Sequence, residues 1–343
     1  MSERRGVADA SGDAPIGIIA NPASGKDIRR LVAHASVFDN DEKSSIVRRV
    51  ILGAHAAGAR RFLYLSDPHQ LVERAIDRIG LDGLCCEPLE SPGTDSALDT
   101  IVAAGRMREA GCGVVVTLGG DGTNRAVALG WLDLPLVAIS TGTNNVFPRL
   151  LEGTVAGAAA GLVATGRVPL GRVALQAKRV QVEIEGEKPD LALIDAVLVD
   201  GRFIGARALW EARALRAAVL TRAEPAAVGI AAVAGLVAPL RADEDAGLLV
   251  RFGGTGRSVL APIAPGLFER VPLCSAEPLT LGCSTTFEGP GLLALDGERE
   301  CALKPGQRVI LTVLRDGPRV IDVDATLLFA AQHGLFCLGA AQG

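Results

Sequence analysis

A single aspartate stands among three glycines in the stretch LGGDGTNRAVA, residues 118–128, directly after the apolar run VVVT. Gly119, Gly120 and Gly122 would let the backbone approach a phosphate or a ribose closely. The carboxylate of Asp121 could accept a proton from a hydroxyl, or bind a ribose hydroxyl or Mg²⁺. A plain Asp-Gly turn would need only one glycine. We therefore predict that Asp121 is catalytic and that it acts on an acceptor hydroxyl rather than on folding.

Two further polar loops follow apolar runs in the same way. ANPASGKD (20–27) follows IGIIA, and STGTNNVFPR (140–149) follows LVAI. The first loop is not a Walker A motif, because alanine stands at position 20 and aspartate at position 27. It is either a phosphate contact or a solvated loop. The predicted nucleotide-binding residues are Asn21, Ser24, Gly25, Lys26, Gly119, Gly120, Gly122, Thr123, Asn124, Gly142, Thr143, Asn144 and Asn145.

The elements around these loops alternate in type over the first 165 residues. Apolar positions recur at helical spacing over 42–57, 71–80 and 96–111, between short apolar runs that are typical of buried strands. We expect the helix after the glycine loop to begin near Asn124. Such alternation predicts a parallel sheet covered on both faces, with the three loops together at the carboxyl ends of its strands.

After about residue 166 the chain consists of short strand-like segments separated by glycine and proline, which favours an antiparallel β domain. Helical pieces are expected over 206–217 and 226–237. In LALDGERE the Asp296-Gly297 pair is typical of a hairpin turn. We predict a disordered tail over 1–14, a Rossmann-like α/β nucleotide-binding domain over 15–165, and a β-rich (β-sandwich) substrate domain over 166–318.

Composition excludes several classes of protein. The 343 residues carry a net charge of −4 and 3% aromatics, without the basic stripe of a nucleic-acid binder. Seven scattered cysteines and four histidines form no zinc-type spacing, so no protein-bound metal is predicted. The first residues lack an apolar leader, and 226–240 is too short to span a bilayer. We expect a cytoplasmic protein without membrane insertion that forms a homodimer or tetramer.

GGDGT, preceded by NPASGK and followed by STGTNN, resembles the superfamily of NAD kinases, diacylglycerol kinases and sphingosine kinases. The resemblance spans nearly the whole chain. Segments such as NPASGKDIRRLVAHASVFDNDEKSSIVRRV and VLTRAEPAAVG are similar to the ATP-NAD kinase-like group of acetoin catabolism. The resemblance implies a ligand cleft between the two domains and a tail over 319–343 that returns to the first domain. It also implies catalytic assistance from Asp296 and Glu298.

The chain departs from NAD kinases on the acceptor side. Ile194-Asp195 stands near the position of the Asn-Glu pair that holds the substrate ribose, which makes Asp195 the predicted acceptor-binding residue. AEPAAVG replaces a hydroxyl-rich stretch that helps to hold the dinucleotide. The nucleotide side is therefore predicted to be retained and the acceptor side to be altered.

Three functions follow from these observations. The first is a kinase that uses ATP, or polyphosphate, with Mg²⁺ carried by the nucleotide, to phosphorylate NAD, another nucleotide or a small hydroxylated metabolite. The second is a regulatory or accessory protein that binds a nucleotide without turnover. The third is a lipid kinase of the diacylglycerol type, with residues 226–240 lining a lipid pocket.

Overall fold

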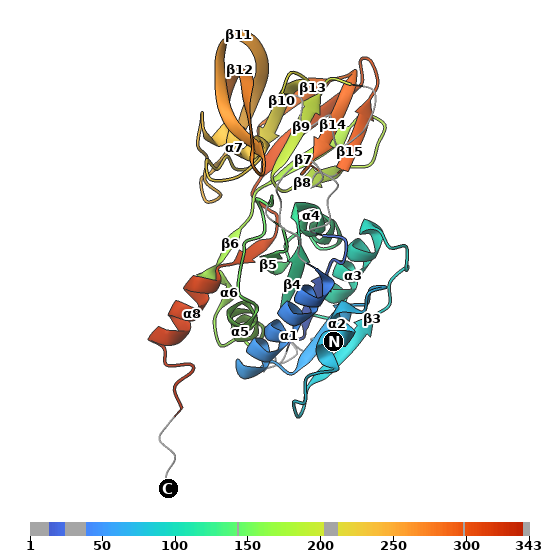
Figure 1. Ribbon diagram of the computed structural model, residues 1–343, viewed down its shortest axis with the longest axis vertical. Helices are drawn as coiled ribbons and strands as arrows, with labels where there is room; N and C mark the ends of the chain where they lie inside the picture. Colours follow the sequence, from blue (N-terminus) through green and yellow to red (C-terminus); the bar gives the residue numbers. More distant parts are fainter. Residues whose placement is uncertain (1–13, 25–38, 143, 202–211, 298, 339–343) are drawn as a thin grey trace, which may run out of the picture.

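The computed structural model describes residues 14–24, 39–142, 144–201, 212–297 and 299–338. A helix-covered parallel sheet occupies one end of the molecule, and antiparallel strands occupy the other (Figure 1). The predicted fold class, a Rossmann-like α/β part with a β-rich part, is confirmed.

The first sheet has the strand order β3-β2-β1-β4-β5-β17-β6. All neighbouring pairs are parallel except β17 with β6. Every residue of β4 is buried, as expected for a continuous apolar run in a sheet covered on both faces. Strand order reverses between β1 and β4, so the ligand crevice of such a sheet falls at the ends of these two strands. The strands are β1 (Ile16–Ala20), β2 (Arg61–Leu65), β3 (Cys85–Leu89), β4 (Val114–Gly119), β5 (Pro135–Ser140), β6 (Ala174–Gln176) and β17 (Arg319–Ile321).

Helices cover both faces of this sheet. One apolar core joins it to α1, α2, α5 and α8, and a second joins it to α3 and α4. Helix α4 begins at Asp121, three residues before the predicted start at Asn124, so the aspartate belongs to the first helical turn. The helices are α1 (Asn40–Ala56), α2 (Leu71–Ile76), α3 (Ala97–Glu109), α4 (Asp121–Gly130), α5 (Gly153–Ala164), α6 (Leu170–Val173) and α8 (Val323–Gln332).

Two antiparallel sheets form the β-rich part, with strand orders β12-β11-β10-β9-β14-β15 and β13-β16-β7-β8. Their facing apolar side chains share one core, to which β7, β9, β14 and β16 all contribute. Helix α7 (Ile230–Gly235) packs on the other face of the larger sheet. The strands are β7 (Arg179–Ile184), β8 (Asp190–Ala192), β9 (Asp195–Val199), β10 (Leu215–Leu220), β11 (Ala246–Ala264), β12 (Leu267–Thr280), β13 (Ser284–Glu288), β14 (Gly291–Leu295), β15 (Arg299–Leu303) and β16 (Arg308–Leu314).

The prediction of a helix over 206–217 is wrong for the part of this range that the structure describes. Residues 215–217 lie in β10, which pairs with β9 and β11, so strand pairing overrides the local helical preference. Residues 202–211 lie outside the described part. Near the end of the chain, β17 inserts between β5 and β6 and is followed by α8, which packs on α5.

Close packing of α1 on α5 depends on glycines spaced four residues apart, Gly153, Gly157 and Gly161. A Cβ atom on Gly157 would lie 2.0 Å from the carbonyl oxygen of Val50, well inside van der Waals contact. The two backbones can approach this closely only because the side chains are missing.

Gly157→Ala is therefore expected to lower the free energy of unfolding by about 1–3 kcal/mol, because overpacking outweighs the gain in helix propensity. Gly105→Ala in α3 is the matched control, because its Cβ would meet Gly130 at an ordinary 3.7 Å. The control is expected to gain about 0.5–1 kcal/mol. Urea unfolding measures both, and equal stability of the two variants would contradict this account of the helix pair.

Candidate active site

Hydrogen bonds tie the three polar loops together at the carboxyl ends of β1, β4 and β5. The Asn21 side chain donates from Nδ2 to Thr123 Oγ1 at 2.8 Å, and Ser24 Oγ lies 2.7 Å from Thr141 Oγ1. The backbone N–H of Asn21 donates to the carbonyl of Leu118 at 2.9 Å. The structure thus brings Asn21 beside the glycine loop and Ser24 beside the loop after β5, as a shared crevice requires.

A buried lysine that the sequence analysis did not identify supports the first loop. Lys43 is fully buried at the start of α1, and its Nζ donates to the carbonyls of Asn21, Pro22 and Ser24 at 3.1, 3.0 and 2.6 Å. Its position three residues before Ile46 places it on the apolar face of the helix, and this spacing could have revealed it. The ammonium group keeps these three carbonyls pointed toward itself, which fixes the backbone of residues 21–24.

The glycines of GGDGT fit tightly against neighbouring side chains. A Cβ on Gly119 would lie 2.4 Å from Thr123 Oγ1, and one on Gly120 would lie 2.9 Å from Asn145 Oδ1. Asn124 is fully buried and bonds to Thr117 Oγ1 and to the carbonyl of Gly120, both at 2.8 Å. Close packing within the protein therefore requires small residues here, before any ligand is considered.

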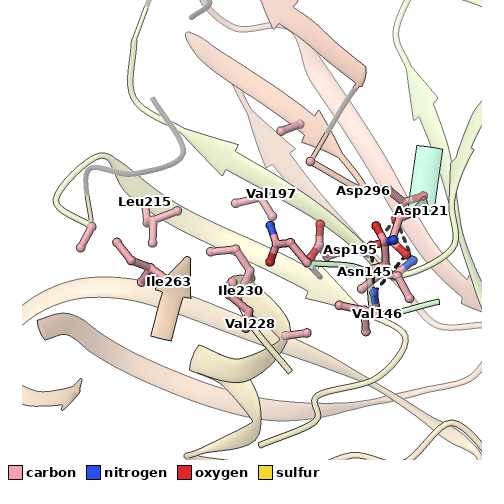
Figure 2. Close-up of a pocket in the computed structure, with 17 residues that line it drawn as sticks. Asp121, Asn145, Val146, Asp195, Val197, Leu215, Val228, Ile230, Ile263 and Asp296 are labelled. Carbon is pink, nitrogen blue, oxygen red and sulfur yellow. Dashed lines mark hydrogen bonds between the residues drawn. The ribbon is translucent and has the colours of Figure 1, made fainter. Parts of the chain in front are cut away.

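Asp121, Asp195 and Asp296 meet in one cleft of about 100 Å³, which we call the aspartate cleft. Figure 2 shows the three carboxylates gathered at one end, and Val197, Leu215, Ile230 and Ile263 at the other. Asn144, Asn145 and Val146 also line it. The cleft is therefore polar at one end and aliphatic at the other.

The carboxylate of Asp121 is already engaged with the protein. It accepts the backbone N–H of Phe147 at 2.8 Å and that of Val146 at 3.1 Å on each oxygen. These bonds fix the segment that follows β5, which is a structural role that the sequence analysis did not assign to Asp121.

Asp296 plays a comparable part on the opposite wall. It sits at the first position of the β14–β15 turn with φ of 50°, and Gly297 follows with φ of 68°, which gives the hairpin turn expected of Asp-Gly. Its carboxylate accepts the N–H groups of Leu193 and Ile194 at 2.8 Å and of Asp195 at 3.2 Å. Asp296 thereby positions the start of β9.

Asp195 lies beside these two carboxylates in the cleft, and only 9% of it is exposed (Figure 2). Burial raises the pKa of Asp195 well above its ordinary value, and the nearby charges of Asp296 and Asp121 raise it further. Its carboxyl group makes no hydrogen bond with any other described residue. A carboxyl with a raised pKa that lines a cleft is a candidate for proton transfer.

A second cavity opens on the other side of the α4 N-terminus. We call it the loop cavity; it is lined by residues 20–23 after β1, residues 65–68 after β2, and Gly122 and Thr123. The first turn of α4 thus separates the loop cavity from the aspartate cleft. Gly25, Lys26, Thr143 and Glu298, predicted to contact nucleotide or acceptor, lie outside the described residues.

Within the described ranges, no group of three or more histidine, cysteine, aspartate or glutamate side chains is arranged to hold a metal ion. None of the helices described there has the length and hydropathy to cross a membrane.

A parallel sheet with a glycine loop, facing a β-rich part with a carboxylate turn, defines a protein with the NAD kinase-like fold. The family model of the ATP-NAD kinase N-terminal domain matches residues 16–168. That of the acetoin catabolism protein X C-terminal domain matches residues 178–316. The chain is 38% identical to acetoin catabolism protein X of Cupriavidus necator over 334 residues, 93% of each chain. This chain therefore belongs to the acetoin catabolism protein X family.

Two further comparisons agree with the resemblance seen in the sequence. An NAD kinase of Nitratidesulfovibrio vulgaris is 31% identical over 68% of this chain and 75% of its own. The crystal structure of yeast NADH kinase complexed with NADH superposes with a TM-score of 0.53 at 12% identity, covering 97% of this chain and 91% of that chain. The second match shows the shared fold.

Asp121→Asn is expected to lower the free energy of unfolding by about 1–3 kcal/mol, because charge-assisted bonds to two backbone N–H groups are weakened. Asp82→Asn, at an exposed turn position, is the control and is expected to stay within about 0.5 kcal/mol of the unchanged protein. Urea unfolding measures both variants. A stability loss no larger than that of the control would mean that the bonds of Asp121 to the segment after β5 contribute nothing.

Asp195→Asn is expected to change stability in the opposite direction at neutral pH. The folded state holds the proton of Asp195 more tightly than the unfolded state, whose carboxyl titrates near 3.8. As the pH rises from about 3.8 through the raised pKa of the folded state, ionisation of Asp195 therefore lowers the free energy of unfolding. The asparagine variant has no carboxyl to ionise and does not lose this stability. The variant should therefore unfold at a higher temperature than the unchanged protein at pH 7, and this difference should vanish below about pH 3.8. An advantage that does not change with pH would contradict the raised pKa.

Proposed function

We propose that this protein is an ATP-dependent phosphotransferase whose acceptor is an uncharged alcohol bound in the aspartate cleft. One observation carries the proposal: the first turn of α4 lies between two cavities. Gly122 and Thr123 line the loop cavity, whereas Asp121 lines the aspartate cleft. A nucleotide in the first would direct its terminal phosphate toward an acceptor in the second.

The loop cavity offers backbone donors to a nucleotide, while its described lining also holds three aspartates, Asp67, Asp95 and Asp99, and no lysine, arginine or histidine, so Mg²⁺ would have to offset the charge of the phosphates. Backbone N–H groups at the start of a helix favour phosphate, and the ten-residue α4 supplies such an end beside Gly122. The loop after β1, fixed by Lys43, forms the opposite wall. Mg²⁺ would arrive with the nucleotide phosphates and neutralise the charge that develops on transfer. A cytoplasmic location and assembly as a homodimer or tetramer belong to the same proposal.

In the transfer step, the oxygen of the acceptor attacks the terminal phosphorus, its proton passes to a carboxylate, and ADP leaves. Asp195 fits the role of base better than Asp121 or Asp296 does. The carboxylates of the other two accept two and three backbone N–H groups, respectively, whereas that of Asp195 makes no hydrogen bond within the described chain. Asp121 and Asp296 would then position the acceptor and the walls of the cleft.

The lining of the aspartate cleft supports an uncharged acceptor. Three of the described lining residues are aspartates, and none is lysine, arginine or histidine. A pyrophosphate such as that of NAD would meet negative charge without a compensating cation. A small alcohol could instead place its hydroxyl at the carboxylates and its carbon atoms against Val197, Leu215 and Ile230. Phosphorylation of NAD is accordingly expected to be weak or absent.

Labelled ATP with Mg²⁺, incubated with the full chain and with butane-2,3-diol, acetoin, NAD, NADH or diacylglycerol, tests the proposal. Transfer to the uncharged small alcohols is expected. Asp195→Asn should lower the rate by roughly 10²–10⁴-fold and remove the fall in rate at acid pH, with ATP affinity unchanged. Asp82→Asn serves as the control.

Three outcomes would contradict parts of this assignment. Turnover of NAD at about 1–10³ s⁻¹ with a KM below about 1 mM would make NAD the acceptor. Full activity of Asp195→Asn would remove it as the base. Preferred transfer to diacylglycerol would make the protein a lipid kinase.

A second candidate function is nucleotide binding without turnover, in a regulatory or accessory protein. The observation that favours it is the engagement of Asp121 and Asp296 with backbone N–H groups, which leaves only Asp195 for chemistry. Tight ATP binding with no transfer to any acceptor tested would support this function against the kinase.

A further inference from the structure

A third cavity, of about 200 Å³, lies on the far side of the segment that follows β5. We call it the arginine cavity, because Arg149 and Arg222 both line it. The rest of its wall is largely apolar and includes Phe147, Leu175, Val320 and Val323. It therefore combines two guanidinium groups with a surface suited to carbon chains.

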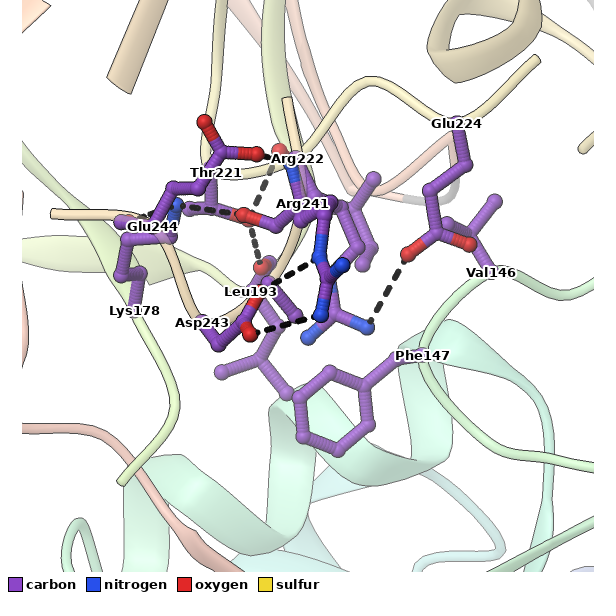
Figure 3. A network of polar contacts seen from close by, with 12 residues as sticks. Val146, Phe147, Lys178, Leu193, Thr221, Arg222, Glu224, Arg241, Asp243 and Glu244 are labelled. Atoms are coloured by element: carbon purple, nitrogen blue, oxygen red, sulfur yellow. Dashed lines mark hydrogen bonds and ion pairs between the residues drawn. The ribbon is translucent and has the colours of Figure 1, made fainter. Parts of the chain in front are cut away.

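Arg222 is a buried cation whose hydrogen-bonding capacity is not filled. Its side chain is 9% exposed, and its Nε is buried without a hydrogen-bond partner. The guanidinium lies 5.4 Å from the centre of the Phe147 ring, and its ion pair with Glu224 is long, at 3.8 Å (Figure 3). A buried donor without a partner costs free energy, and the charge of the guanidinium is left only partly compensated, which an anion in the cavity would improve.

Arg149 adds a second cation beside the first. Its side chain is exposed and makes no hydrogen bond or ion pair with any described residue. Burial lowers the pKa of Arg222, and the positive charge of Arg149 lowers it further, so the two guanidinium groups repel each other. An anion between them would relieve this repulsion, and the planar guanidinium matches the geometry of a carboxylate.

The other charged residues of the cavity limit the charge of its ligand. Asp322 and Asp324 stand at the start of α8, where Asp322 Oδ1 accepts the N–H of Ala325 at 2.9 Å. With two carboxylates on the wall and Glu224 beside Arg222, a dianion such as a phosphate ester would be repelled. A monoanion between the two guanidinium groups would meet less repulsion than a dianion, and a short apolar body fits the lining.

The cavity is fixed in shape before any ligand binds. Ala242 on its wall belongs to a loop whose carbonyls at Arg241, Glu244 and Ala246 accept bonds from Lys178 Nζ at 3.1, 2.8 and 2.7 Å. Lys178 lies beside this loop in Figure 3. A preformed site loses less entropy on binding than one that must be ordered.

One short segment borders both the arginine cavity and the aspartate cleft. Asn144, Asn145 and Val146 line the cleft, whereas Phe147 and Arg149 line the arginine cavity. Asp121 holds the middle of the segment through the N–H groups of Val146 and Phe147. A ligand that restrains Arg149 therefore restrains the backbone that Asp121 contacts.

We propose that the arginine cavity binds a small monocarboxylate with an apolar body, held by Arg149 and Arg222. A ligand bound there restrains the segment 144–149, and this segment also lines the aspartate cleft, so the two cavities are coupled. The cavity is distinct from both proposed substrate sites, and binding there does not require that the protein be a kinase.

Isothermal titration of the full chain with sodium butyrate tests the binding site, with butan-1-ol and inorganic phosphate for comparison. Butyrate is expected to bind at least about tenfold more tightly than either. Arg222→Met keeps the apolar stem on Phe147 and should weaken binding at least about tenfold, as should the exposed Arg149→Met. Arg251→Met, an exposed arginine on β11, is the matched control, and Asp195→Asn should leave butyrate binding unchanged.

Hydrogen exchange measures the coupling, and butyrate should slow exchange in peptides that cover 144–149 at least about twofold. Undiminished binding in Arg149→Met would overturn the site, even if Arg222→Met does not fold. Equal binding of phosphate would contradict the specificity for a monocarboxylate. Absence of butyrate binding would overturn the site and leave Arg222 as an internal counter-ion of the aspartates in the aspartate cleft. Unchanged exchange with butyrate bound would overturn the coupling.

Discussion

The hydrogen bonds from Val146 and Phe147 to the carboxylate of Asp121 hold together the parts of this molecule that bear on function. They join the start of α4 to the segment after β5, and that segment forms walls of two cavities. The contact is charge-assisted and only partly exposed, so it is stronger than an ordinary surface bond. Because Asp121 also lines the aspartate cleft, the same carboxylate links the fold to the chemistry proposed there.

Two buried lysines each hold a loop by donating hydrogen bonds to several of its carbonyls. Lys43 gathers the carbonyls of the loop after β1, and Lys178 gathers those of the loop 241–246. Burying an ammonium is costly, and carbonyl acceptors offset much of that cost. For Lys178, burial, together with the positive charges of Arg315 and Arg222, lowers the pKa to about 8. Each lysine thereby fixes the backbone of the loop segment that it contacts.

Charge is distributed unevenly around the crevice. Three aspartates face the aspartate cleft, whereas the buried cations that interact with them, Arg222 and Arg125, do not line it. The negative lining keeps the pKa of Asp195 high, since burial and two neighbouring carboxylates all favour its protonated form. The cleft thus gathers three carboxylates, with no lysine, arginine or histidine among its described lining residues.

The alternation of apolar runs and helical spacings was enough to predict the two-part fold, because burial on both faces of a parallel sheet leaves a clear pattern. GGDGT and Asp296-Gly297 were found in the sequence because glycine and turn geometry constrain residue types locally. The partners of those residues could not be found there: Asp121 reaches across to Val146, and Asp296 reaches across to Leu193. Lys178 and Arg222 became functional candidates only through burial, and the strand at 215–217 only through its pairing partners. The sequence by itself determined which residue types could do chemistry, whereas long-range packing decided which of them share a site, because charge and hydrogen bonding depend on distances that the chain order does not contain.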